Sequence, residues 1–201
     1  MTMAFLASNP DLPRPAPASG EIDAATLREA QGGDARALER FIRHYERSIF
    51  AFLSRSIGRG PEVEDMAQEV FVRAYRALPR FEKRSEARVS TWLLQIAVRL
   101  VLDRRKRKRV PVQSLDERHM ATDARTPETE RRHNELVQIL ERTAAELPDE
   151  QRVAFILADF HGLDTEQIAA VTETQFATVK TRLFRAREHM KQVLTELAKG
   201  E

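Results

Sequence analysis

The stretch that decides the fold of this chain is residues 164–187, which read DTEQIAAVTETQFATVKTRLFRAR. Asp164, followed by Gln167, has the form of a capping box, in which both side chains satisfy backbone donors at a helix N-terminus. This pattern predicts a short helix over 165–171, and a polar break follows it. From Phe176 onward apolar residues recur at steps of three and four, which predicts a second, longer helix.

The longer helix combines an apolar seam with basic faces. Its seam consists of Phe176, Val179, Leu183, Ala186, Met190, Val193 and Leu197. Its other faces carry Thr178, Lys180, Thr181, Arg182, Arg185, Arg187 and Lys191. A short helix, a tight turn and a longer basic helix form a helix-turn-helix, whose second helix reads the major groove of DNA through phosphate and guanine contacts. An amphipathic helix with a solvated basic face is the alternative, but the cap and the turn favour DNA binding.

Apolar periodicity and proline content divide the rest of the chain. Residues 21–109 and 134–201 are both helical in pattern, and neither shows the alternation of a strand. Residues 110–133 are charged and contain two prolines, so we expect a linker there. Residues 1–20 hold four of the nine prolines, and we expect a disordered tail. The predicted fold class is all-α, with two small helical domains joined by a flexible linker and a helix-turn-helix in the C-terminal one.

The composition excludes several classes of protein. Lys and Arg (33) nearly balance Asp and Glu (31), so the distribution of charge matters more than the net charge of +2. Cysteine is absent, which rules out disulfides and thiolate metal sites. No apolar run approaches the roughly 20 residues of a membrane-spanning helix, so no membrane insertion is expected. The five histidines lack metal-ligand spacing and no phosphate loop or nucleophile motif occurs, so we expect neither an enzyme nor a cofactor.

Two further surfaces are candidates for binding. A run of cations from Arg104 to Arg109 continues a predicted helix that also carries Arg99, and it could contact nucleic-acid phosphates. The predicted helix over 62–78 has an acidic surface beside its apolar face, made of Glu64, Asp65, Gln68 and Glu69 next to Val72. Acidic residues in a first turn suit the helix dipole, which is one explanation. Attraction to a basic protein partner is the other.

Several of these segments resemble a known family. The second conserved region of the extracytoplasmic-function (ECF) sigma factors of bacterial RNA polymerase is similar to residues 61–78 (PEVEDMAQEVFVRAYRAL), Phe81, residues 90–97 (STWLLQIA), Asp103 and Arg104. The fourth region of that family is similar to residues 147–152 (LPDEQR), Phe160, Gly162, Leu163, residues 166–169 (EQIA) and residues 178–187 (TVKTRLFRAR). Both regions occur in the family's order, and the family's third region is missing between them.

The resemblance implies a role for each surface. The polymerase clamp helices would be bound by Asp65, Gln68, Glu69 and Val72. The loop over 81–89 and the following helix would open the −10 element and hold a flipped base, through Phe81, Arg84, Arg88, Arg99, Arg104 and Arg105. The −35 element would be read by Thr178, Lys180, Thr181, Arg182, Phe184, Arg185 and Arg187. Trp92 could stack on an unpaired base, but its place in an apolar stripe favours the core.

The resemblance also implies partners and leaves one rival. Core RNA polymerase and promoter DNA would be partners, an anti-sigma factor is a plausible third, and the cytoplasm is the expected location. A stand-alone helix-turn-helix regulator is the alternative function. The chain departs from the family where many members have Leu-Gly in the turn and this one has Thr172 and Glu173. Either Glu173 adopts a positive φ, which costs free energy in a non-glycine residue, or the turn differs.

Overall fold

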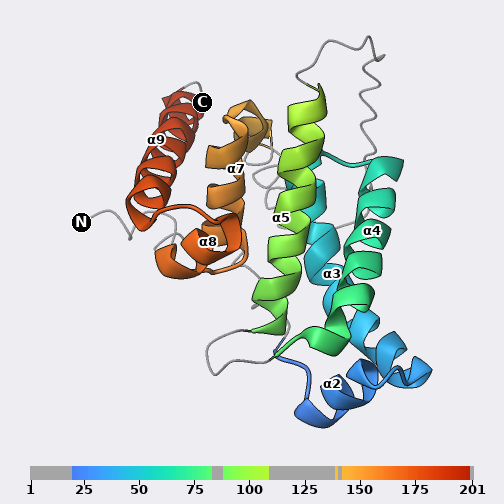
Figure 1. Ribbon diagram of the computed structural model, residues 1–201. Helices are drawn as coiled ribbons and strands as arrows, with labels where there is room; N and C mark the ends of the chain where they lie inside the picture. The colour runs from blue at the N-terminus through green and yellow to red at the C-terminus, as the bar shows by residue number, and fades with distance from the viewer. Residues whose placement is uncertain (1–19, 83–87, 109–138, 140–141, 200–201) are drawn as a thin grey trace.

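A computed structural model describes residues 20–82, 88–108, 139 and 142–199, with the backbone alone at 107–108 and 197–199 (Figure 1). Its elements are α2 (Ala24–Gln31), α3 (Ala35–Ile57), α4 (Pro61–Ala77), the 3-10 turn η1 (Leu78–Arg80), α5 (Val89–Lys108), α7 (Asp149–Phe155), the π-helical turn η2 (Ile156–Phe160), α8 (Thr165–Thr172) and α9 (Phe176–Lys199). No strand occurs in these ranges, and the predicted all-α fold is confirmed. The expected tail over 1–20, except Gly20, and the expected linker over 110–133 lie outside the described residues, as do Arg84 and Arg109.

The N-terminal half packs α2, α3, α4 and α5 around one core. Asp34 caps α3 by accepting a hydrogen bond from the Ala37 amide at 2.8 Å. The turn from α3 to α4 contains Gly58 and Gly60, both at positive φ, and Pro61 opens α4. The fully buried side chains of this core include Tyr45, Ile49, Phe52, Leu53, Val70, Leu93, Leu94 and Val101. The apolar stripes of three helices therefore meet, as their periodicity predicts.

The C-terminal half contains the predicted helix-turn-helix. Asp164 accepts a hydrogen bond from the Gln167 amide at 2.8 Å, and the Gln167 side chain accepts one from the Asp164 amide at 3.0 Å, so the predicted capping box is confirmed. After α8 comes a tight turn, and α9 then packs along α7. Ile168 and Val171 of α8 are buried together with Val179 of α9, which fixes the angle between the two helices.

The two halves pack against each other in this structure. Helix α5 lies against α8 and α7, and the end of α3 lies against η2 (Figure 1). The guanidinium of Arg55 stands 4.6 Å from the centre of the Phe160 ring, and the rings of Phe52 and His161 meet edge to face at 5.8 Å. One apolar cluster includes buried residues of both halves. The contact between the halves is therefore a packed interface.

His161 makes this interface sensitive to pH. Its side chain is buried, and desolvation together with the charge of Arg55 lowers its pKa from 6.5 to about 4. Between these two pH values the unfolded chain binds a proton that the folded chain does not, so stability is fully present above pH 6.5 and falls as the pH drops through that window.

We therefore expect the free energy of unfolding to fall by about 3 kcal/mol in all between pH 6.5 and pH 4 because of this residue. The measurement is urea denaturation at a series of pH values, with His161→Phe as the comparison because phenylalanine cannot take up a proton. Carboxylates that titrate in the same range affect both proteins and cancel in the difference. Parallel profiles for the two proteins would contradict the prediction.

Candidate nucleic-acid and protein interfaces

The turn of the helix-turn-helix is closed by a residue in the left-handed conformation. Glu173 has φ 52° and ψ 42°, so the first of the two expectations for this position is confirmed. The Thr174 amide donates to the Ala169 carbonyl at 3.0 Å. This hydrogen bond gives a partner to a carbonyl in the last turn of α8, as in a C-terminal cap. Glutamate occupies a conformation that glycine adopts at lower cost, and its carboxylate reaches Gln95 and Arg99 of α5.

Helix α9 presents an exposed face at its N-terminal end. Lys180, Thr181, Phe184 and Arg185 are exposed, with 64% of the Phe184 surface open to solvent. Thr178 and Arg182 lie half-buried beside them, and Arg182 donates to the Thr174 hydroxyl at 3.2 Å. These residues lie together as the sequence predicts, on the side of α9 that faces away from the core.

One residue of α9 differs from the sequence-based expectation, and another has a partner that the sequence did not indicate. Phe176 is predicted to lie in the apolar seam, but it is the first residue of α9 and is 46% exposed. The Lys180 ammonium lies 5.6 Å from the centre of its ring. Arg187, a predicted −35 contact, pairs with Asp159 of η2 at 3.1 Å in this structure. Burial raises the pKa of Asp159, and Arg187 opposes that shift, so this guanidinium stabilises the inside of the domain.

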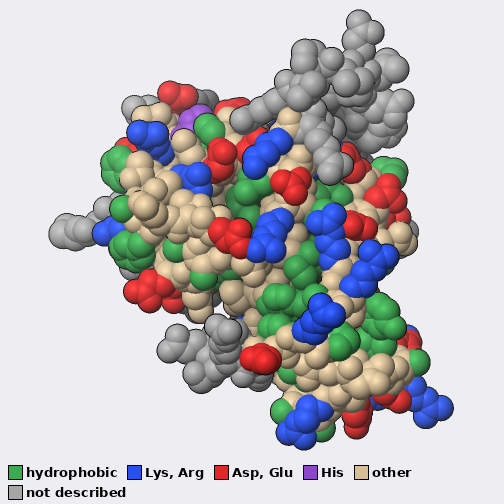
Figure 2. Space-filling view, in the orientation of Figure 1, with side chains coloured by type: hydrophobic (Ala, Val, Ile, Leu, Met, Phe, Trp, Pro, Cys, Tyr) green, Lys and Arg blue, Asp and Glu red, His purple; other side chains and the backbone are tan. Residues whose placement is uncertain are grey.

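Several arginines of α5 pair with carboxylates. Arg99 pairs with Glu173, to which Gln95 also donates at 3.2 Å. Arg104 pairs with Glu62 of α4, a neighbour within the same half. Figure 2 shows Lys and Arg side chains spread over the face of α4 and α5, with acidic and hydrophobic side chains between them. Glu173, the partner of Arg99, lies in the turn between α8 and α9, so this ion pair joins the two halves.

Arg105 also lies at the interface between the halves. It pairs with Asp149 at the start of α7 and donates to the Ser56 carbonyl at 2.5 Å. The same Ser56 carbonyl accepts a hydrogen bond from Arg152 at 3.2 Å. Two of the residues predicted to contact the −10 element, Arg99 and Arg105, are thus engaged by the C-terminal half.

Phe81 and Trp92 form a stacked pair beside the N-terminus of α5. Their ring centres are 4.6 Å apart and the rings are tilted by 34°. Both side chains are half-buried and pack against the core cluster. Trp92 is therefore partly a core residue, and the rest of its side chain is open to solvent. Arg88 is exposed one turn away.

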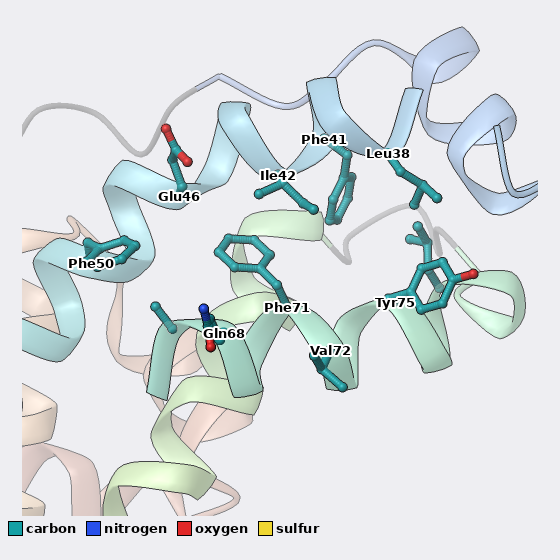
Figure 3. A pocket seen from close by; sticks show the side chains of 11 residues that line it. Leu38, Phe41, Ile42, Glu46, Phe50, Gln68, Phe71, Val72 and Tyr75 are labelled. Atoms are coloured by element: carbon teal, nitrogen blue, oxygen red, sulfur yellow. The ribbon is translucent and has the colours of Figure 1, made fainter. Parts of the chain in front are cut away.

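An apolar groove of about 520 Å³ runs between α3 and α4 (Figure 3). Gln68 and Val72, which the resemblance assigns to polymerase binding, line it, while Asp65 is exposed on the same helix. Glu69 pairs with Arg73 at 2.6 Å. The groove is also lined by Leu38, Phe41, Ile42, Glu46, Phe50, Ala67, Phe71, Tyr75 and Leu78.

Three apolar residues of this groove were missed as candidates by the sequence analysis. Ile42, Phe50 and Tyr75 are exposed, and Figure 3 shows them around the opening between the two helices. A signal was present in the sequence, because the apolar residues of α3 cover more of its circumference than one core-facing stripe needs. Exposed apolar patches of this kind mark interaction sites.

These features define a helical protein with a helix-turn-helix that carries an exposed basic face in one half and an apolar groove beside acidic residues in the other. Comparison with known families agrees: Sigma-70 region 2 matches residues 41–110, and Sigma-70 region 4 matches residues 138–190. Among curated proteins, the chain is 33% identical over 187 residues to the RNA polymerase sigma-H factor of Pseudomonas aeruginosa, covering 88% of this chain and 96% of that protein. It is 33% identical over 176 residues to the ECF RNA polymerase sigma-E factor of Escherichia coli K12, covering 83% and 91% of the two chains.

The chain belongs to the ECF sigma factors of bacterial RNA polymerase. It is a sigma factor that directs promoter-specific initiation of transcription, and the stand-alone regulator is not favoured. Two solved structures share its fold at 22% identity. RpoE in complex with the anti-sigma factor NepR from Bartonella quintana has a TM-score of 0.61 and covers 80% of this chain and 98% of that one. CnrH with the cytosolic domain of CnrY has a TM-score of 0.60 and covers 86% and 96%.

A search of the described helices for a membrane-spanning segment found none that is long and apolar enough.

Proposed function

We propose that the groove between α3 and α4 is the surface that docks on core RNA polymerase. The single observation that carries this proposal is the apolar lining of the groove, which continues into exposed Val72 and Gln68. An apolar centre with a charged rim is the usual anatomy of a protein interface. Asp65 and Glu69 supply an acidic rim, which suits a basic partner surface.

The two DNA surfaces supply promoter recognition in this proposal. The exposed face of α9, made of Lys180, Thr181, Phe184 and Arg185 with Thr178 and Arg182 beside it, reads the −35 element. Phe81, Arg88 and the basic residues of α5 contact the −10 element. Because Arg187 is paired with Asp159, we assign it to the stability of the C-terminal half and leave it out of the recognition surface.

Promoter binding requires the two halves to separate. Elements centred near −10 and −35 lie about 25 base pairs apart, which is about 85 Å of B-form DNA. Helices α5 and α8 touch each other in this structure, so the two DNA surfaces cannot reach both elements at once. Opening also frees Arg99 from Glu173 and Arg105 from Asp149, which makes these cations available to phosphates.

Further partners and the location follow from the same function. RpoE and CnrH were solved with NepR and with the cytosolic domain of CnrY, and NepR is an anti-sigma factor. An anti-sigma factor is therefore a plausible partner of this chain, acting in the cytoplasm where RNA polymerase works. We propose no intrinsic enzymatic activity: the chain supplies recognition, and the polymerase supplies the chemistry.

The experiment is gel filtration of the protein with sigma-free core RNA polymerase, followed by transcription from a promoter that the wild-type holoenzyme selects. We expect stable co-elution and initiation from one start site. Charge reversal in Asp65→Lys together with Glu69→Lys should lower the affinity for core polymerase by about tenfold or more, seen as loss of co-elution, because an acidic rim becomes basic. If wild-type protein does not bind core polymerase but shifts duplex DNA alone, the chain acts as a stand-alone regulator and the proposal is wrong.

A further inference from the structure

The segment from Gly20 to Gln31, which contains α2, lies before the part of the chain that matches Sigma-70 region 2, residues 41–110. It is nevertheless part of the N-terminal core, because Ile22, Leu27 and Ala30 are buried. Two polar side chains of this segment bind the backbone at Leu78 and Phe81 and at Val89 and Ser90, the two ends of the loop proposed to contact the −10 element. Neither has a role in the surfaces described above.

Gln31, the last residue of α2, holds the chain where it leaves α4. Its side-chain amide donates to the Leu78 carbonyl at 3.2 Å and to the Phe81 carbonyl at 2.6 Å. These carbonyls lie at the beginning of η1 and just after its end. One amide group therefore fixes the exit of this turn and the backbone of Phe81.

Glu21 holds the chain where α5 begins. Its carboxylate accepts hydrogen bonds from the Val89 amide at 3.0 Å, the Ser90 amide at 3.3 Å and the Ser90 hydroxyl at 2.8 Å. The first amides of a helix have no partner within the helix, and a carboxylate there is also favoured by the helix dipole. Glu21 thus acts as an N-terminal cap supplied by a residue far away in the sequence.

The two contacts act on one small region. Phe81, whose carbonyl Gln31 holds, stacks on Trp92 in the first turn of α5, the turn that Glu21 caps. The segment itself is anchored, because the Ile22 amide donates to the buried Tyr45 hydroxyl at 3.1 Å. Burial raises the pKa of Tyr45 to about 12, so this hydroxyl keeps its proton at physiological pH.

We propose that Glu21 and Gln31 are positioning residues for recognition of the −10 element. This inference rests on the proposed function, in which Phe81, Arg88 and α5 contact that element. Neither residue touches DNA in this proposal. Together they fix the separation and orientation of Phe81 and the first turn of α5, which lie on either side of the bases to be read. Misplacement of a recognition group by about 1 Å is enough to lose much of its selectivity.

The test compares base discrimination by holoenzymes that contain Gln31→Leu, Glu21→Ala or the conservative Glu21→Gln. Each is assayed by transcription from two duplex templates, the promoter selected by wild-type holoenzyme from a pool of random −10 sequences and a copy with one −10 base pair changed. The readout is the ratio of the two yields, which does not change when a variant merely folds in lower amount. Glu29→Ala is the matched control, because Glu29 lies on the same helix in an exposed pair with Arg40.

We expect Gln31→Leu and Glu21→Ala to lower the discrimination ratio about tenfold, with co-elution with core polymerase unchanged. Glu21→Gln, which keeps one acceptor oxygen, should fall between Glu21→Ala and the wild type, and Glu29→Ala should match the wild type. An equal loss of yield on both templates, with the ratio preserved, would show that the contacts only stabilise the fold and would overturn the proposal. If wild-type holoenzyme selects no promoter, the proposed function fails, and this inference falls with it.

Discussion

Replacing Arg152 by methionine is expected to lower the free energy of unfolding by about 3–5 kcal/mol. Arg152 is buried, and its guanidinium donates to the Ala144 carbonyl at 2.8 Å, to the Leu147 carbonyl at 3.0 Å and to the Ala145 carbonyl. It also reaches the Ser56 carbonyl of α3 in the other half. Methionine has a similar length but no donor, so the Ala145 and Leu147 carbonyls lose the guanidinium as a partner. The Ala144 carbonyl still accepts from the Leu147 amide, and the Ser56 carbonyl still accepts from Arg105.

The measurement for Arg152→Met is urea denaturation followed by circular dichroism. The matched control is Arg185→Met, which removes the same charge from an exposed position of α9 and should change stability by no more than about 0.5 kcal/mol. Desolvation and the nearby charge of Arg105 lower the pKa of Arg152 to about 10, which still leaves it charged at neutral pH. A loss below about 1 kcal/mol in Arg152→Met would contradict the structural role given to these hydrogen bonds.

Replacing Val72 by aspartate is expected to weaken binding of core polymerase by about 30-fold or more. Val72 lines the groove between α3 and α4 and is 41% exposed in the free protein, so the fold should tolerate the change. Docking would enclose the new carboxylate in an apolar contact, where its desolvation is unfavourable. Residues at the centre of an interface commonly contribute 2 kcal/mol or more, which corresponds to about 30-fold in affinity.

Affinity for core polymerase is measured by titration of a fluorescently labelled chain. Phe184→Asp is the reciprocal control, because it places the same carboxylate on an exposed apolar residue of α9, the helix proposed to read the −35 element. We expect Phe184→Asp to retain core affinity and to lose binding of a −35 duplex, while Val72→Asp shows the opposite pattern. Wild-type core affinity in Val72→Asp would remove the groove as the docking surface.

Local patterns in the sequence were sufficient for most of the helices. The capping box at Asp164 was predicted from two residues three apart, because a helix N-terminus has donors that its own backbone cannot satisfy. The positive φ of Glu173 was one of two expectations derived from the absence of a glycine in the turn. In both cases the deciding interactions occur within a few residues, so the sequence contains the information.

The surfaces were predicted less completely than the helices. Phe176 was predicted to lie in the buried seam but is exposed. Periodicity alone does not show which positions of a helix face its neighbours actually cover. Ile42 and Tyr75 have ordinary core-type side chains, and only the spacing of α3 and α4 makes them the lining of an open groove. For Arg187, basic character predicted a DNA contact, and only the fold shows that Asp159 lies within ion-pair distance of this half-buried residue.

The sequence by itself determined the all-α class and the helix-turn-helix, because these depend on side-chain period, caps and turns within short windows. The two conserved regions and their order came from the resemblance of their motifs to a known family. The tertiary structure alone decided which polar groups find each other across the chain. Glu21 reaches Ser90, Gln31 reaches Phe81, and Arg99 reaches Glu173 over separations that no local pattern encodes. The physical reason is that a charge or an amide on a helix surface has many possible partners, and only packing of the apolar faces brings one of them within hydrogen-bond distance.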